Sequence, residues 1–373
     1  MQLVNNIINS GVRYYNEYTP LTSSEVIDDF GNKAVNFCST QYLGIPWRAD
    51  FNEQINSIKI DGSFFGSLGS NYLGGTHPSR LKLENKIKKL MSYPKALCFA
   101  SGWAANYSIC EYLSKDYDLI VSDIKNHNSV ITGLKANHVK KLIVDLNETD
   151  LSEIVKDYKE DRIAVIYPTV EGITGVETFL KFSNLDDRRK VTIITDECHS
   201  FGILGHLGIK QHGFIRPDIR MIGFSKSLGI MGAAVLSSEV LINDLTQIAS
   251  PWIYSTAIPP IIWDVISISL DISLECKKER IQIIDKANLL RSELNRFGIS
   301  HSGSLHITGI NFPSSIDPRH IENDLKSLGF FVIISEPPTT KNDELISRIA
   351  IQPTHTYQDI RKLVKCIFEL LYI

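Results

Sequence analysis

Between about residues 80 and 235, short apolar runs alternate with segments of helical periodicity, and this alternation restricts the possible folds more than any other feature. Each run is four or five residues long, a length typical of buried strands. Segments 80–91 and 150–158 between them have helical patterns. Apolar strands that alternate with helices predict an α/β fold, with a mostly parallel sheet covered by helices. The runs are 95–99, 119–122, 141–144, 163–167, 191–195 and 221–224.

The rest of the chain predicts two flanking parts. Residues 1–45 are polar, aromatic and irregular, which indicates an N-terminal arm. Prolines at 251 and 259–260 interrupt the α/β pattern, so we expect the large domain to span 46–262. A long helical stretch to about residue 297, followed by mixed strands and helices, predicts a smaller α+β C-terminal domain over 263–373.

Charge and cysteine content exclude several classes of protein. With 39 basic and 42 acidic side chains, the net charge of −3 provides no attraction to nucleic acid or to an anionic membrane. No stretch reaches the roughly 18 apolar residues of a membrane span, and the N-terminus lacks the pattern of a signal peptide. The six cysteines are widely separated and include no C-x-x-C pair, which is typical of a reducing compartment. We therefore expect a soluble, cytoplasmic protein.

Polar side chains follow four of the predicted strands, at the point where each strand ends. In a parallel sheet, ligands bind at the carboxyl ends of the strands, where helices begin and backbone N–H groups point outward. We therefore expect these side chains to lie close together at one edge of the sheet. They are Ser101-Gly102, Asp123 with His127, Asp196 with His199, and Ser225-Lys226.

Two interpretations of the segment around Asp196 fail on the sequence. Asp196-Glu197-Cys198-His199 is similar to the D-E-x-H box of helicases, but the chain contains no Gly-Lys dipeptide and so no phosphate loop. A zinc site would use Cys198 and His199 with His206 and His212, yet their spacing matches no zinc pattern. We expect no metal site.

Pyridoxal phosphate fits the strand-end residues better. This cofactor needs an amine for a Schiff base, an acid for its pyridinium nitrogen and donors for its phosphate. Lys226 and Asp196 follow neighbouring strands and supply the amine and the acid. The helix that begins near Gly102 and Trp103 offers N-terminal amides for the phosphate, and His127 could lie flat on the ring.

From Tyr42 onward the chain resembles the α-oxoamine synthases, a branch of the fold type I pyridoxal phosphate enzymes. Eight matching segments occur in the order of that family. They are Tyr42-Leu43-Gly44; 66–70 with His77 and Leu83-Glu84; Ser101-Gly102-Trp103-Ala104-Ala105-Asn106; Asp123 with His127-Asn128-Ser129; Asp196-Glu197-Cys198-His199-Ser200-Phe201-Gly202; Phe224-Ser225-Lys226-Ser227-Leu228-Gly229; 253–260; and Arg348-Ile349-Ala350 before His355.

The resemblance implies a fold type I transferase that joins a small amino acid to an acyl-CoA and releases carbon dioxide. It also implies a homodimer with shared active sites. The implied roles are these: Lys226 binds the cofactor covalently and moves the α-proton; Asp196 pairs with the pyridinium nitrogen; His199 bonds the ring hydroxyl; His127 stacks on the ring; Gly102, Trp103 and Ser225 bind the cofactor; Ser255 and Thr256 reach the phosphate from the neighbouring subunit; Arg348 grips the amino acid carboxylate; and Thr40 lies near the substrate.

Departures from the family pattern lie around the substrates and the edge of the cofactor. The family often has Ser-Asn-Asp where this chain has Ser39-Thr40-Gln41, and Gly-Ser-Arg where it has Gly69-Ser70-Asn71. Gly172 stands where a serine usually contacts the cofactor hydroxyl, and Gly223 where the family favours threonine. These changes indicate altered substrate use with catalysis retained.

Within the family, two features are similar to autoinducer synthases of the cholera or Legionella type. One is Gly102-Trp103 together with the Asp-Glu-x-His-Ser box, and the other is the segment 339–342. That similarity implies a medium- or long-chain acyl-CoA substrate and an α-aminoketone precursor of an α-hydroxyketone quorum-sensing signal. The alternative is a synthase of primary metabolism: 8-amino-7-oxononanoate synthase, 2-amino-3-ketobutyrate CoA ligase or serine palmitoyltransferase. A non-catalytic partner subunit is a third possibility, against which Lys226, Asp196 and His199 argue.

The three glycines of 202–212 suggest a mobile rim.

Overall fold

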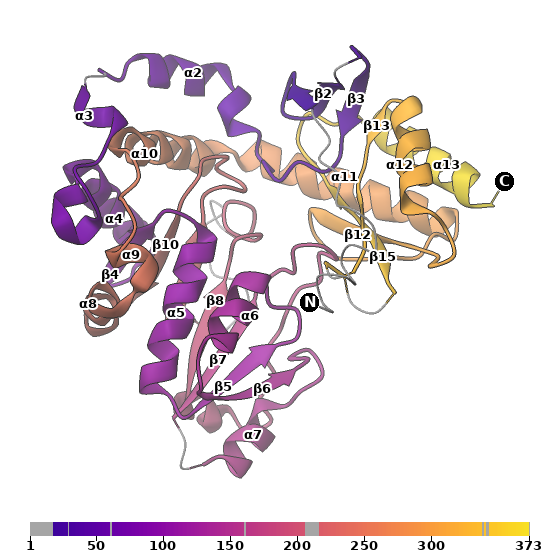
Figure 1. Ribbon diagram of the computed structural model, residues 1–373. Coiled ribbons are helices and arrows are strands. Elements are labelled where there is room, and N and C mark those ends of the chain that lie inside the picture. The colour runs from indigo at the N-terminus through magenta and orange to yellow at the C-terminus, as the bar shows by residue number, and fades with distance from the viewer. Residues whose placement is uncertain are drawn as a thin grey trace, which may run out of the picture.

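The computed structural model describes residues 18–372 except 29, 60–61, 160–161, 206–215, 338 and 341–342. Its centre is a seven-stranded sheet, seen below the long upper helices in Figure 1. The strands, in spatial order, are β4 (Lys95–Phe99), β10 (Ala233–Ser237), β9 (Ile219–Gly223), β8 (Val191–Asp196), β7 (Ile163–Pro168), β5 (Leu119–Asp123) and β6 (Lys140–Val144).

This sheet confirms the predicted α/β class, and all six apolar runs contribute strands to it. The pairs β5–β6, β5–β7, β7–β8 and β8–β9 are parallel, so their carboxyl ends share one edge. No apolar run predicted β10, which pairs antiparallel with both β4 and β9. Because β10 runs in the opposite direction, it ends at the other edge and brings no residue of its carboxyl end to the expected site.

Helices cover both faces of the sheet, as parallel strands with buried side chains require. Apolar residues of β4, β9 and β10 pack with α5 (Gly102–Asp116) and α8 (Glu239–Ile248) on one face. The other face packs against α4 (Pro78–Met91) and α10 (Pro260–Glu275). The remaining helices of this region are α2 (Ala49–Asn56), α3 (Gly62–Phe65), α6 (Asn128–Lys135), α7 (Leu151–Asp157) and α9 (Ser250–Ile253).

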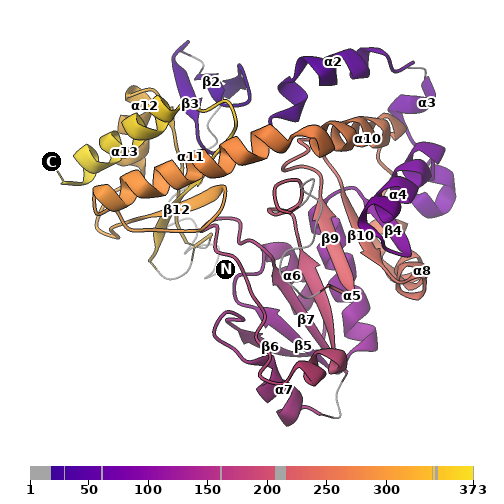
Figure 2. The same ribbon diagram turned by 180° about the vertical axis from the view of Figure 1, so that it is seen from behind.

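The C-terminal part is built on a second sheet, which is antiparallel. Its four strands are β11 (His301–Ser302), β12 (Ile307–Phe312), β15 (Leu345–Ala350) and β14 (Ile334–Ser335). Three helices pack around it: α11 (Lys277–Arg296), α12 (Pro318–Ser327) and α13 (Tyr357–Tyr372). In Figure 2, α10 and α11 follow one another along the molecule and connect the two parts, with Cys276 between them.

Part of the expected N-terminal arm forms strands. β1 (Tyr18–Pro20), β2 (Glu25–Asp28) and β3 (Lys33–Asn36) form a sheet with β13 (Phe330–Phe331) of the C-terminal part. Backbone bonds between β3 and β13 therefore tie residues near the start of the described chain to the C-terminal part. The boundaries of the three expected domains stay a prediction.

Over the ranges that the structure describes, no helix combines the length and the apolar character that crossing a bilayer requires.

Candidate active site

The carboxyl edge of the sheet brings together most of the residues that the sequence analysis singled out. Asp196 ends β8, and Lys226 follows β9 by three residues. Gly102 opens α5 after β4, and His127 is the N-cap of α6 after β5. The loop after β7 brings Gly172 to the same edge, next to the His199 ring.

Lys226 is partly buried and lies close to both charged and polar side chains. Burial lowers the pKa of its amine, and the nearby positive charge of Arg348 lowers it further. Cys198 and Asp196 act in the opposite direction. The net lowering makes a neutral, nucleophilic amine more available near neutral pH than an exposed lysine would provide.

Asp196 is 7% exposed, and protein hydrogen bonds fix both of its carboxylate oxygens. Oδ1 accepts from the backbone N–H of Cys198 (2.9 Å), and Oδ2 accepts from Nδ2 of Asn106 (2.7 Å). Nδ2 of Asn106 also donates to Oγ of Ser129 (3.0 Å), and this oxygen lies 2.8 Å from Nδ1 of His127. A continuous hydrogen-bonded chain thus joins Asp196 to His127.

Asn106 and Ser129 lie in the segments that resemble the α-oxoamine synthases, but the resemblance implied no role for them. Both are buried, at 2% and 0% exposure. Asn106 is four residues after Gly102 and therefore lies on the same face of α5. A buried amide one turn inside a helix that begins at a site is the sequence signal that could have identified it.

His199 is joined to Tyr42 by a hydrogen bond of 2.6 Å between Nδ1 and the phenol oxygen. Burial holds the pKa of His199 well below its usual value, and any positive charge on Lys226, Arg348, His306 or His127 lowers it further. These electrostatic effects also show that the five side chains share one region.

The N-terminus of α5 offers two unused amides. Ser101 caps the helix: its Oγ accepts from Ala104 N (3.1 Å), and its carbonyl accepts from Ala105 N (3.1 Å). Within the described chain, the N–H groups of Gly102 and Trp103 have no hydrogen-bond partner. Two free donors at the positive end of a 15-residue helix form a suitable site for an anion such as a phosphate.

Arg348 of β15 lies at the junction of the two parts of the molecule. Nη1 donates to the carbonyl of Gly172 (3.3 Å) and Nη2 to that of Cys38 (3.1 Å). Its Nε is buried and lacks a hydrogen-bond partner in the described chain, so the guanidinium has a donor to spare. Thr40, two residues beyond Cys38, is partly buried in the segment that Arg348 contacts.

Three expected cofactor-binding residues are solvent-exposed. Ser225 precedes Lys226 in the chain, so it lies at the site. Ser255 and Thr256 lie elsewhere on the surface, where Thr256 forms a β-bridge with Ser70. Within the described ranges, no hydrogen bond joins their side chains to the network around Asp196.

Glu197 has a structural position, although it follows Asp196 directly. Its carboxylate forms an ion pair of 2.6 Å with Arg220, and these side chains are 1% and 3% exposed. Thr195 donates to the same carboxylate (3.0 Å). Its partners lie in the sheet, so Glu197 holds β8 and β9 together.

No metal centre is visible in the described ranges, where no three His, Cys, Asp or Glu side chains form a ligand group. His206 and His212 of the zinc alternative, and the greater part of the expected rim 202–212, lie outside the described residues.

Comparison with known proteins places most of the chain in one family. The family described as "Aminotransferase class I and II" matches residues 32–367. Among curated proteins, a putative 8-amino-7-oxononanoate synthase of Methanococcus vannielii is 30% identical over 371 residues, covering 96% of each chain. An 8-amino-7-oxononanoate synthase of Buchnera aphidicola is 28% identical over 360 residues, covering 93% of this chain and 92% of the relative.

Solved structures share the fold. A serine palmitoyltransferase from S. paucimobilis with a bound PLP–myriocin adduct has a TM-score of 0.85 at 20% identity, covering 99% of this chain and 96% of that one. The 8-amino-7-oxononanoate synthase of Francisella tularensis has a TM-score of 0.76 at 23% identity, covering 90% and 97%. These similarities bear out the fold type I architecture that the sequence predicts.

Proposed function

The chain belongs to the aminotransferase class I and II family and, by its curated relatives, to the α-oxoamine synthases; from this premise we propose that it condenses a small amino acid with an acyl-CoA and releases carbon dioxide and CoA. The observation that carries the proposal is the placement of Lys226, Asp196 and two histidines around the free N-terminus of α5. Each of these groups has a separate task in such a reaction.

Pyridoxal 5'-phosphate is the cofactor that the family membership indicates, and the residues present fit it. The amine of Lys226 would bind it, and the fixed carboxylate of Asp196 would pair with its ring nitrogen. The unpartnered amides of Gly102 and Trp103 suit its phosphate. When bound, this cofactor supplies an electron sink for the α-carbon of the amino acid.

The protein's own groups would orient the amino acid and move its proton. Arg348 has a free Nε–H and can bind a carboxylate with two donors, a geometry that suits guanidinium. The lowered pKa of Lys226 makes its neutral amine available, which would accept a proton from the α-carbon and return one to it after the new carbon–carbon bond has formed and carbon dioxide has left. His127 is held by Ser129, which in turn accepts from Asn106.

The names of the relatives support a synthase of primary metabolism more than the autoinducer interpretation. Curated relatives are described as 8-amino-7-oxononanoate synthases, and structural neighbours as serine palmitoyltransferases. Neither the relatives nor the structures named above are autoinducer synthases. We therefore propose the alternative of the sequence analysis as the main assignment. A quorum-sensing product stays a prediction that a substrate survey can test.

We further propose that the active unit is a homodimer. Large apolar side chains are exposed around the bridge between Ser70 and Thr256, in a chain that buries most of its other apolar residues. Exposed apolar side chains that flank one bridge in the sequence suit a contact surface. It includes Leu68, Tyr72, Leu73 and Tyr254. If a second copy of the chain bound to this surface, Ser255 and Thr256 of each copy would lie next to the other copy.

The test is a matrix of small amino acids against acyl-CoAs, with release of free CoA and of carbon dioxide measured in parallel. Glycine, alanine and serine are each combined with acetyl, dicarboxylic, medium-chain and long-chain acyl-CoAs. The proposal predicts equal amounts of both products for one combination and none for Lys226→Ala. A medium-chain preference would favour an autoinducer synthase. Absence of CoA release in every combination would contradict the proposal and favour a non-catalytic partner.

A further inference from the structure

Tyr42 is joined to the site by a hydrogen bond to His199. Its phenol oxygen lies 2.6 Å from Nδ1 of His199, and this is its single hydrogen bond within the described ranges. A buried hydroxyl whose hydrogen has no other acceptor must donate it to Nδ1. An imidazole that accepts at Nδ1 carries its own hydrogen on Nε2.

We infer that Tyr42 is a positioning residue, which fixes His199 as the Nε2–H tautomer and directs this N–H toward the edge of the site beside Gly172. The inference deepens the proposed function and rests on it in one respect: the acceptor for this N–H is the ring oxygen of the cofactor.

The ionisation of both groups agrees with a neutral pair. Burial raises the pKa of Tyr42 far above its usual value, so the phenol keeps its hydrogen. Burial also lowers the pKa of His199, and the nearby positive charge of Lys226 adds to this effect. A neutral phenol that donates to a neutral imidazole is therefore the stable arrangement at neutral pH.

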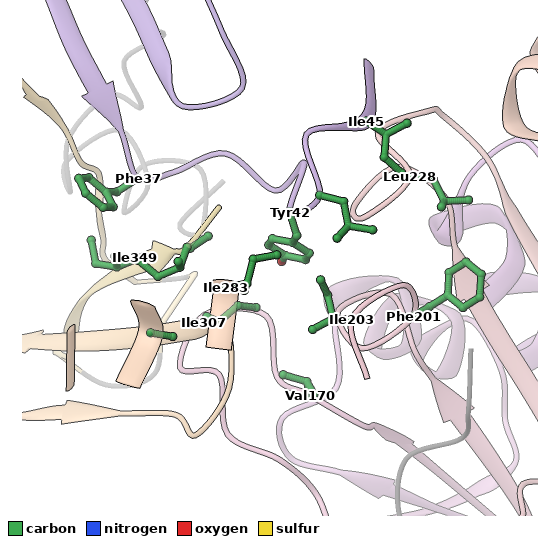
Figure 3. Packing of buried hydrophobic residues seen from close by; sticks show 14 of the residues in the cluster. Phe37, Tyr42, Ile45, Val170, Phe201, Ile203, Leu228, Ile283, Ile307 and Ile349 are labelled. Atoms are coloured by element: carbon green, nitrogen blue, oxygen red, sulfur yellow. The ribbon is translucent and has the colours of Figure 1, made fainter. Parts of the chain in front are cut away.

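The packing around Tyr42 keeps its hydroxyl in place. Figure 3 shows the ring among apolar side chains of both parts of the molecule, including Ile203 and Ile307, and the residue is fully buried. The ring of His306 packs edge-on against it, with centroids 4.3 Å apart and an interplanar angle of 77°. Burial lowers the pKa of His306 to about 3, so this neighbour is also neutral.

Gly172 itself places no side chain against the other edge of the His199 ring. A Cβ at position 172 would lie 2.6 Å from Nε2 and 3.1 Å from Cε1 of His199, closer than such contacts allow. The carbonyl of Gly172 already accepts from Arg348 (3.3 Å). The imidazole therefore occupies the space that a side chain at position 172 would need, and its Nε2–H is the donor that remains for the cofactor oxygen.

The test begins with the full-length protein without cofactor. Long-range ¹H–¹⁵N spectra of histidine side chains distinguish the two tautomers, and His199→Asn identifies the signal by its loss. The inference predicts an Nε2–H tautomer in the wild type and a mixture in Tyr42→Phe. Tyr93→Phe is a matched control, because Tyr93 is also buried and donates to the carbonyl of Pro217 (2.8 Å). An Nδ1–H tautomer in the wild type would overturn the inference.

Cofactor binding supplies a second readout. Loss of one neutral hydrogen bond predicts about 3- to 10-fold weaker binding of pyridoxal phosphate by Tyr42→Phe, with Tyr93→Phe unchanged. Equal affinity of Tyr42→Phe and the wild type would contradict a role for Tyr42 in cofactor binding. If the wild type bound no cofactor, the proposed function would fail, whereas the spectra would still decide the tautomer.

Discussion

Gly223 stands where the α-oxoamine synthases favour threonine. In the structure, the side chain of another residue lies in the space that the threonine would need. A Cβ at position 223 would lie 2.6 Å from Sγ of Cys198. The same sulfur lies 3.8 Å from Sδ of Met221 and would be 3.1 Å from a Cβ at Gly102. The Cys198 thiol therefore fills the space that the threonine would need, and we expect the two positions to be coupled.

The contact distances give the magnitude of this coupling. Gly223→Thr in the wild type forces atoms together at 2.6 Å, and overpacking of this kind costs about 1–3 kcal/mol. In a Cys198→Ala background the sulfur is gone, and the nearest atoms of residue 198 are Cβ at 3.3 Å and Cα at 3.4 Å. At these distances, the atoms of residue 198 need to move by only a few tenths of an ångström. We expect a coupling energy of about 1–2 kcal/mol in favour of the double variant.

Urea unfolding of the wild type, both single variants and the double variant measures this coupling. Gly133→Ala is the control, because its Cβ would lie 2.8 Å from Cβ of Cys110, a contact that Cys198→Ala does not relieve. Its cost should be the same with and without Cys198→Ala. If threonine at position 223 were equally destabilising in both backgrounds, the steric argument would be refuted.

Three further predictions follow from buried groups. Glu197→Ala removes the carboxylate that forms an ion pair with the buried Arg220 and should lower the free energy of unfolding by about 3–5 kcal/mol in urea titrations, whereas loss of the exposed Arg162–Asp116 pair should change it far less. Arg348→Lys should raise the KM for the amino acid by at least about 30-fold, a loss of about 2 kcal/mol, and leave the KM for acyl-CoA unchanged; the opposite pattern in steady-state kinetics would reject its role. His306, with a folded pKa of about 3 against 6.5 unfolded, binds a proton only after unfolding between these pH values. Stability should therefore fall with decreasing pH by about 1.4 kcal/mol per pH unit from this group, and His306→Phe should show a shallower pH dependence; an unchanged slope would disprove the effect.

The sequence was sufficient to predict the elements that depend on local pattern. Buried parallel strands are largely apolar, so β8 and β9 could be recognised, and with them the positions of Asp196 at the end of β8 and Lys226 shortly after β9. The antiparallel β10 has the same composition, and its direction depends on pairing that no local pattern encodes.

The side-chain network could not be predicted, because it joins residues far apart in the chain. Tyr42 and His199 are 157 residues apart, and Asn106 and Asp196 are 90 apart. The departures at Gly172 and Gly223 could be read as altered substrate use, yet in the structure both spaces are filled by His199 and Cys198. Altered substrate use at these positions stays a prediction.

The central claim is that Lys226 binds pyridoxal phosphate at the carboxyl edge of the sheet. The most direct measurement is reduction of the purified protein with borohydride after addition of the cofactor, followed by peptide mass spectrometry. The account predicts a pyridoxyl modification on the peptide that contains Lys226, with none on this peptide in Lys226→Ala. An unmodified Lys226 peptide, or modification of another lysine alone, would contradict it.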